Sequence, residues 1–318
     1  MDNLTHTLTG LALSRAGLNR WYTRPALVLI ISANIPDIDV LTSFRGALAY
    51  FENHRGITHS IAMVPVMALL AALITCALGR SVSGWKSAWG LSIIGVASHL
   101  LLDWTNAYGV RFFLPFSSRW FRLDLNNLFD FWIWGVLLLA WLGPLIAKLV
   151  SSEMGARSGP GRGLAIFALA FFLLYDCGRA FSHDRALAIL DSRVYKGEVP
   201  VRVAAFPSSA ANPFEWSGWA ETQRLAINFF PLNIFRDFDP SSGIVIYKPD
   251  ATAAIDAARH ADAVAKFLQF SQYPLWHVTP MPEPDGARRV EVTDWRFPFT
   301  ATAIIDASNR VLSSSFHY

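Results

Sequence analysis

The sequence predicts a membrane α-helical bundle, with about four full spans and two short N-terminal helices, followed by a soluble α+β domain. The 318 residues are 53% hydrophobic and only 16% charged, whereas soluble globular chains carry about 25% charged residues. Residues 1–189 contain every long apolar run and only 10 of the 24 acidic residues. We therefore expect a membrane-embedded domain at residues 1–189 and an extramembrane domain at residues 190–318.

The same composition excludes several classes of protein. Disordered chains combine low hydrophobicity with high net charge, which is the opposite of this pattern. The two cysteines, Cys76 and Cys177, both lie in apolar runs, so we expect neither a disulfide framework nor a thiolate metal site. The net charge of +3 is too small to indicate a nucleic-acid partner. No cleavable signal peptide is expected, because no basic region precedes the first apolar stretch.

Four apolar runs approach the length of about 20 residues that a helix needs to cross a bilayer. They are Ile61–Leu78, Trp85–Leu102, Leu128–Val150 and Gly163–Ala180. Two earlier segments, Leu4–Leu18 and Pro25–Ile35, are shorter and are marginal spans at about 1.5 Å per residue. Such half-helices are tolerated in a membrane where they pack against protein.

If all six segments cross in alternation, the unusual polar residues of the first half fall on one side. The connections on the opposite side carry eight basic residues, against five on the polar side. Basic residues prefer the cytoplasmic side, so the polar side is predicted to face outward. Six crossings return the chain to that side, where we expect residues 190–318.

The C-terminal part alternates between strand-like and helix-like patterns. Ala251–Phe270 is rich in alanine and has apolar residues at helical spacing, which predicts one helix. β-Branched and aromatic content predicts strands at Val201–Phe206, Trp219–Phe229, Gly243–Tyr247, Pro274–Thr279, Arg288–Trp295 and Ala301–Ile305.

The candidate functional residues are histidines and aspartates that flank the predicted spans. His99 and Asp103 are four residues apart, so both can reach one ion from one helix face. Pro36 stops a helix just before Asp37 and Asp39, so that a loop can turn both carboxylates inward. A turn before Thr58 would bring His54 beside His59. The predicted metal ligands are His6, Asp37, Asp39, His54, His59, His99 and Asp103.

Mixed nitrogen and oxygen donors suit zinc, with manganese or iron as alternatives, better than calcium. Seven ligands exceed the four of a single zinc ion, so the site is predicted to hold one or two ions. Each motif alone has an ordinary structural explanation, such as a core histidine or a solvated turn. Together they point to function, because ionisable groups at membrane helix ends are costly unless they are paired or metal-bound. A charge network without metal is the alternative.

Four motifs occur in order and carry a resemblance to a known family. They are Met1-Asp2-Asn3-Leu4-Thr5-His6-Thr7-Leu8-Thr9-Gly10, Ile35-Pro36-Asp37-Ile38-Asp39, His54-Arg55-Gly56-Ile57-Thr58-His59-Ser60 and Ser98-His99-Leu100-Leu101-Leu102-Asp103. Over residues 1–180 the chain resembles the bacterial membrane-bound metal-dependent hydrolases, which include LexA-regulated inner-membrane proteins. Residues Asn212–Trp216 also resemble the longer members. The resemblance implies a bacterial inner-membrane location, a bound metal and hydrolysis.

A metal-dependent hydrolase would activate water, with Asp37 or Asp39 as bridging ligand or proton acceptor. Arg55 could clamp a phosphate or carboxylate, or could anchor to lipid headgroups instead. A site on the outer face favours a phosphoester or lipid-linked substrate and membrane lipid as the partner. The alternatives are a non-catalytic membrane metal-binding or assembly protein and a metal transporter; the sequence identifies no protein partner of residues 190–318.

Overall fold

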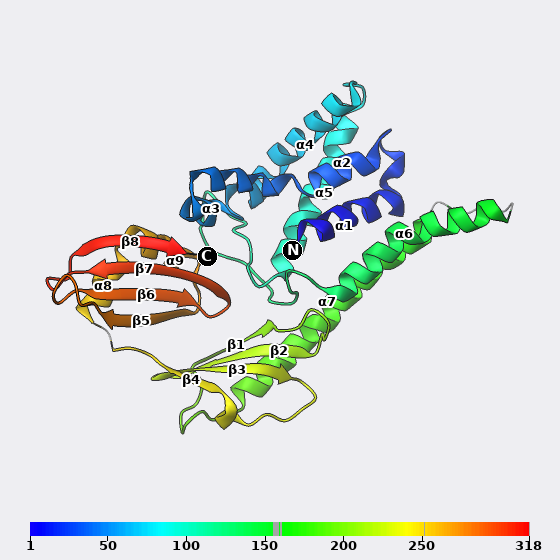
Figure 1. Ribbon diagram of the computed structural model, residues 1–318. Coiled ribbons are helices and arrows are strands. Elements are labelled where there is room, and N and C mark those ends of the chain that lie inside the picture. The colour runs from blue at the N-terminus through cyan, green and yellow to red at the C-terminus, as the bar shows by residue number, and fades with distance from the viewer. Residues whose placement is uncertain (155–158, 160, 251, 318) are drawn as a thin grey trace.

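The computed structural model describes residues 1–154, 159, 161–250 and 252–317. A helical part comes first and is followed by two antiparallel sheets (Figure 1). The α-helices of the first part are α1 (Asn3–Ala16), α2 (Pro25–Ser32), α3 (Ala47–Asn53), α4 (Val64–Gly79), α5 (Trp85–Thr105), α6 (Phe131–Glu153) and α7 (Arg162–Asp191). The 3-10 helices between them are η1 (Leu18–Arg20), η2 (Ile35–Arg45), η3 (Ile57–His59) and η4 (Ile61–Met63).

Three helical segments in the described part of the chain are long and apolar enough to cross a membrane. They are Ile61–Gly79, Phe131–Ser151 and Arg162–Asp191. A fourth crossing is added if α2 and η2, which meet at a bend of 42°, form one broken span. The predicted span at Trp85–Leu102 forms helix α5, but α5 is not in this set, so four full spans are not established.

The first half of the chain packs around the short helix α2. Gly10 of α1 and Gly95 of α5 both face its C-terminal end, where side chains would not fit. A Cβ atom on Gly10 would lie 2.6 Å from the Leu29 carbonyl oxygen, and one on Gly95 would lie 1.9 Å from Ser32 Oγ. Small residues of this kind let helices approach closely where there is no hydrophobic drive between them. The two glycines therefore hold α2 tightly between α1 and α5.

Replacing Gly95 with alanine is expected to destabilise the helical part by about 1–3 kcal/mol, because the added methyl group overpacks the contact with α2. Gly90 lies on the same helix, and a methyl group added there would have no atom within 4 Å, so Gly90→Ala is the matched control. That change is expected to be neutral or to stabilise, since alanine favours helix by about 1 kcal/mol. Thermal unfolding of both variants in detergent measures the difference, and equal midpoints would contradict the close packing.

Each sheet has four antiparallel strands in sequential order. The first sheet contains β1 (Arg202–Pro207), β2 (Glu215–Glu221), β3 (Leu225–Asn233) and β4 (Ile244–Tyr247), with η5 (Pro240–Ser242) before the last strand. Two helices then precede the second sheet, α8 (Ala253–Arg259) and α9 (Asp262–Phe270). The second sheet contains β5 (Pro274–Pro280), β6 (Arg288–Asp294), β7 (Phe297–Ile305) and β8 (Val311–His317).

Two expectations for this part are wrong in detail, and one strand is additional. The single strand expected at Trp219–Phe229 is a hairpin, because the chain reverses between Glu221 and Leu225 and pairs β2 with β3. The single helix expected at Ala251–Phe270 breaks at His260 and Ala261 into α8 and α9, and Ala251 lies outside the described residues. Strand β8 was not expected, because three consecutive serines weaken its pattern.

The two sheets attach to the helical part in different ways. The first sheet packs on the C-terminal half of α7 through Leu190, which lies in one core with Trp216 and Ile227. The second sheet packs on α8 and α9, and its core includes Phe51 of α3. The helix that precedes His54 is thus anchored in the second sheet.

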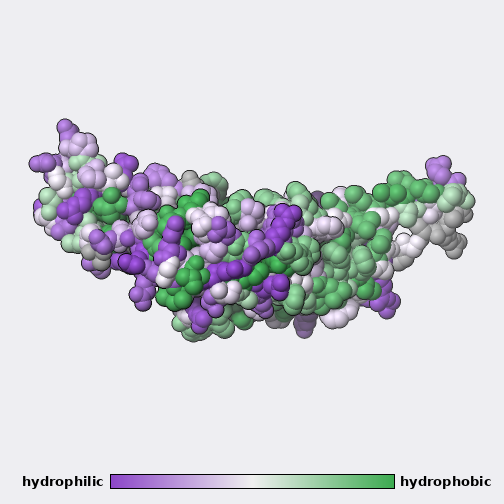
Figure 2. Space-filling model, turned by 90° about the horizontal axis from the view of Figure 1, so that it is seen from below, coloured by the Kyte–Doolittle hydropathy of each residue, from purple (hydrophilic) through white to green (hydrophobic). Residues whose placement is uncertain are grey.

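The surface separates into two regions along the length of the molecule. Figure 2 shows apolar residues over the end formed by α6 and α7 and hydrophilic residues over the end that carries the sheets. Large exposed side chains on the two helices, such as Leu149, Leu173 and Leu174, are apolar. This distribution fits a helical part in the membrane and a sheet region outside it.

Candidate metal centre

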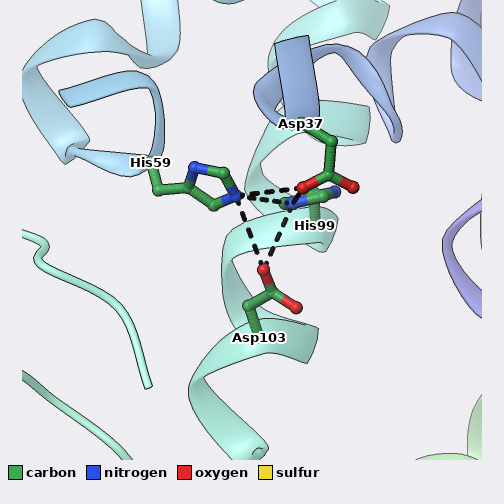
Figure 3. A group of neighbouring side chains, drawn as sticks. All are labelled: Asp37, His59, His99 and Asp103. Atoms are coloured by element: carbon green, nitrogen blue, oxygen red, sulfur yellow. Dashed lines mark hydrogen bonds and ion pairs between the residues drawn. The ribbon is translucent and has the colours of Figure 1, made fainter. Parts of the chain in front are cut away.

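Four of the predicted ligands meet at the ends of three elements (Figure 3). Asp37 comes from η2, His59 from η3, and His99 and Asp103 from successive turns of α5. Each can offer one ligand atom such that all four atoms lie within 4.8 Å of one another. Residues separated by up to 66 positions are therefore brought to one point.

The distances among these ligand atoms fit a four-coordinate ion. His59 Nε2 lies 3.0 Å from His99 Nε2, 3.5 Å from Asp37 Oδ1 and 3.5 Å from Asp103 Oδ2. His99 Nε2 lies 3.6 Å from Asp37 Oδ1 and 3.3 Å from Asp103 Oδ2. A tetrahedron with zinc bonds of about 2.05 Å has edges of about 3.3 Å. Two imidazoles and two carboxylates thus have the spacing and the donor set that a divalent ion requires.

Both histidines of this group are held with Nε2 toward the common point. His99 Nδ1 is 2.7 Å from the Ala33 carbonyl oxygen, which fixes Nδ1 as the donor and leaves the Nε2 lone pair for a ligand bond. His59 Nδ1 lies 3.0 Å from Thr58 Oγ1 and 3.4 Å from Asp39 Oδ2. Partners of this kind orient metal-binding histidines and raise their basicity.

A second group consists of Asp37, Asp39 and His54, and it shares Asp37 with the first. Asp39 already has partners on both oxygens: Oδ1 is 3.2 Å from His54 Nδ1, and Oδ2 accepts from the Arg55 backbone N–H at 2.9 Å. Arg55 holds its backbone at φ 51°, in the left-handed region, to place that N–H. Asp39 is therefore placed to orient His54 and His59, and a second ion would compete with these contacts.

His6 and Arg55 both contact Asp103. Arg55 Nη2 is 2.9 Å from Asp103 Oδ1, and His6 Nε2 is 3.3 Å from the same oxygen. The His6 ring stacks on His99 with centroids 3.9 Å apart. The Met1 amine also contacts Asp103 Oδ1. These groups leave Oδ2 of Asp103 turned toward the four-residue group.

Arg55 is only 4% exposed, so its guanidinium lies inside the site and does not reach a lipid headgroup at the surface. Its Nη1 is 3.4 Å from the Gly109 carbonyl oxygen, and its charge sits 5.1 Å from the Tyr108 ring centre. The lipid-anchor alternative for Arg55 is therefore wrong. Its role as a clamp for a substrate anion stays a prediction.

The group has one side that solvent can reach. The side chains of His59, His99 and Asp103 are at most 1% exposed, whereas those of Asp37 and His54 are each 19% exposed. Solvent therefore reaches the group along this side. Figure 3 shows Asp37 opposite Asp103 across the pair of imidazoles.

The structure thus gathers all seven predicted ligands, but it divides them by position. His59, His99, Asp37 and Asp103 surround one point, while Asp39, His54 and His6 contact members of that group. Sequence reasoning did not identify Thr58 or the Ala33 carbonyl. Thr58 lies next to His59 in the motif His54–Ser60, so its hydroxyl was a predictable partner of that histidine. A backbone carbonyl such as that of Ala33 carries no sequence signal.

Changing Asp39 to asparagine is expected to lower zinc affinity by roughly 10–100-fold, because the ligand His59 loses its orienting carboxylate. Competition with a chromophoric chelator measures the affinity, and Asp256→Asn, at a side chain 73% exposed, is the control. Unchanged affinity would contradict the orienting role. Loss of one of two bound ions would instead place Asp39 among the ligands of a second ion.

The family model for the YdjM inner membrane protein matches residues 1–186. Protein YfhP of Bacillus subtilis is 30% identical over 138 residues, which are 41% of this chain and 42% of YfhP. Inner membrane protein YbcI of Escherichia coli is 35% identical over 124 residues, which are 37% of this chain and 69% of YbcI. The chain thus aligns with less than half the length of YfhP. No solved structure matches the chain.

The matched region contains all four motifs and every residue of the metal centre. It also contains the three apolar helices that are long enough to cross a membrane, apart from the last residues of α7. The resemblance expected from the four motifs is confirmed at the level of the family: the chain belongs to the YdjM family of inner membrane proteins.

Proposed function

We propose that the protein is an integral membrane metal-dependent hydrolase that cleaves a phosphoester in a lipid-linked substrate. The observation that carries the proposal is the set of two imidazoles and two carboxylates at tetrahedral spacing, with solvent access at Asp37 alone among the four. The group lies in a chain with apolar helices of membrane-crossing length. Substrates that reside in the same bilayer are therefore within reach of the site.

A divalent ion, with zinc preferred on the donor set, would supply Lewis-acid polarisation and lower the pKa of a bound water. His59, His99 and Asp103 would hold it from the buried side. Asp37 occupies the accessible side, where a carboxylate can yield its position or bridge to a second ion. This arrangement is that of three firm ligands plus one exchangeable position, which is usual in catalytic zinc sites.

Proton transfer is assigned to His54. Its Nδ1 is held 3.2 Å from Asp39 Oδ1, which leaves Nε2 of this partly exposed ring as the nitrogen that can take up a proton. A carboxylate that orients an imidazole is the usual support for a general base. Asp39 acts in this scheme as a positioning residue, because both of its oxygens are engaged. Arg55 holds Asp103 in place, and its Nε, which has no partner among the described residues, offers one donor toward an anion.

The location of the protein in a bacterial inner membrane is supported by the family and by the apolar helices. We further propose that the chain crosses several times, and that the metal centre and the sheets face the outer side. The proposal rests on the excess of basic residues in the opposite connections. Domain limits after residue 189 and protein partners of the sheet region stay predictions.

A non-catalytic metal-binding protein is the second candidate, and one observation favours it. Zinc sites with four protein ligands are usually structural, because no position is left for water. If Asp37 never leaves, the centre would brace η2, η3 and α5 without chemistry. Metal content alone does not separate the two candidates, whereas turnover does.

The separating experiment uses the full chain in phosphatidylcholine nanodiscs with zinc or manganese added. Hydrolysis of bis(p-nitrophenyl) phosphate and of dipalmitoyl phosphatidic acid is expected only in the metal-loaded protein. His54→Ala is expected to lower kcat by roughly 10²–10⁴-fold with bound metal retained, and His260→Ala, on the exposed surface of the sheet region, serves as control. Full metal content without turnover of either ester would favour the structural role.

A further inference from the structure

An apolar groove lies beside the metal centre, between helices α1, α5 and α7. Its volume is about 480 Å³, within the range of about 300–1,000 Å³ typical of ligand pockets. The walls are formed mainly by Leu13, Leu101, Leu102, Trp104, Leu169 and Leu173. One wall belongs to α7, which is long and apolar enough to cross a membrane, so that with α7 spanning the bilayer the open side of the groove faces hydrocarbon.

The groove runs beside the metal centre along two helices, although none of its lining residues is a ligand. On α1, His6 of the centre is followed one turn later by Thr9, which lines the groove. On α5, Ser98 and Leu102 line the groove, and their neighbours His99 and Asp103 belong to the metal centre. A molecule that lies in the groove therefore has one end within about a helical turn of the ligands, or about 5.4 Å along the axis.

Two polar features distinguish this groove from an ordinary gap between membrane helices. Thr9 is 5% exposed, and its Oγ1 has no hydrogen-bond partner among the described residues. A buried hydroxyl without a partner costs free energy, which a ligand acceptor would recover. At another point of the lining, Asp176 accepts from Asn126 Nδ2 at 2.7 Å, and the same amide donates to Thr105 Oγ1 at 3.1 Å. The otherwise apolar groove thus carries polar groups at defined places.

We propose that this groove binds the hydrocarbon tail of the lipid substrate and so brings its phosphoester head group to the metal centre. The identity of the head group rests on the proposed hydrolase function, whereas binding of the tail does not. A tail that enters the groove from bulk lipid gains no hydrophobic transfer energy, so the apolar walls hold it through close packing. Thr9 donates to an ester or phosphate oxygen at the junction of tail and head group.

A photoreactive phosphatidic acid with a diazirine in its palmitoyl tail tests the groove directly. With the full chain in phosphatidylcholine nanodiscs, the expected cross-links lie on α1, α5 and α7 at the groove. Leu173→Trp is expected to remove most of this labelling, because the larger side chain fills the groove. Leu174→Trp is the matched control: its side chain is 71% exposed against 68% for Leu173, and it does not line the groove.

A second variant on the opposite wall, Leu101→Trp, is expected to act like Leu173→Trp. A metal content equal to that of the wild type shows that each variant is folded. In both, hydrolysis of dipalmitoyl phosphatidic acid should fall while hydrolysis of bis(p-nitrophenyl) phosphate stays unchanged. Labelling spread evenly over all lipid-facing helices, or equal loss in Leu174→Trp, would overturn the tail site. Groove labelling without hydrolysis of either ester would overturn the hydrolase function and leave the tail site standing.

Discussion

His59→Ala and His99→Ala are each expected to lose the bound ion to background. Each substitution removes one of the two nitrogen donors, whose Nε2 atoms lie 3.0 Å apart at the centre of the group. Changes to residues that merely orient a ligand already lower affinity by roughly 10–100-fold, and loss of the ligand itself is expected to exceed that. Metal analysis of the purified protein after dialysis against a weak chelator measures the loss. The double variant should show the same background level as either single variant.

His277→Ala is the control for this experiment, because His277 is exposed on β5, far along the chain from the four motifs. It should keep the full metal content of the wild type. If either His59→Ala or His99→Ala also kept it, the two imidazoles would not share an ion. The cluster would then be the charge network without metal that the sequence left open.

Asp294→Ala is expected to destabilise the second sheet by about 3–5 kcal/mol, because it leaves a buried cation unpaired. Asp294 is 2% exposed and accepts from Arg296 Nε at 2.9 Å and from Ser271 Oγ at 2.9 Å. Burial by itself would raise the pKa of Asp294, but the Arg296 guanidinium and the hydrogen bonds lower it further than burial raises it. The contribution of this carboxylate is thus present at neutral pH and is lost as the pH falls below its folded-state pKa.

Hydrogen exchange of β5 to β7 in the full chain measures the effect of Asp294→Ala. Exchange should accelerate by roughly a hundredfold or more, at about 1.4 kcal/mol for each tenfold. Asp256→Ala removes a carboxylate that is 73% exposed and should change exchange little. Equal protection in both variants would show that the buried pair contributes nothing to the sheet. Because Arg296 also donates to the Ala107 carbonyl at 2.9 Å, the loop that follows α5 should loosen with the sheet.

The metal centre was predictable because its ligands lie in short sequence motifs. His99 and Asp103 share a helix face by spacing alone. The loop expected after Pro36 is wrong: α2 ends at Ser32, and Pro36 lies in the first turn of the 3-10 helix η2, which carries both Asp37 and Asp39. The division between Asp37, a member of the four-residue group, and Asp39, which orients histidines, was not predictable. It depends on the Arg55 backbone N–H and on His54, which reach Asp39 only through the fold.

The fold was predictable at the level of its two parts and less so within them. The apolar runs that became α4, α6 and α7 carry few charged residues, and these lie toward the ends of the runs: Asp130, Lys148, Asp176 and Arg179. Helix α5 also formed where a helix was expected, but Lys86 and several small polar residues leave its power to cross a bilayer undecided. In the sheets, tight reversals decided the strand limits: the hairpin between β2 and β3 turns within a few residues that carry no proline or glycine.

Helix α7 runs without interruption from Arg162 to Asp191. Its first half packs with α1 and α6 through Ala168 and Phe172, and its last residues enter the core of the first sheet. A continuous helix of this kind leaves no hinge between the membrane-crossing part of α7 and the first sheet. A compartment-sensitive reporter fused after β8 and a membrane-impermeant label on a cysteine placed near Phe116 must therefore read out the same side of the membrane, whatever the number of crossings.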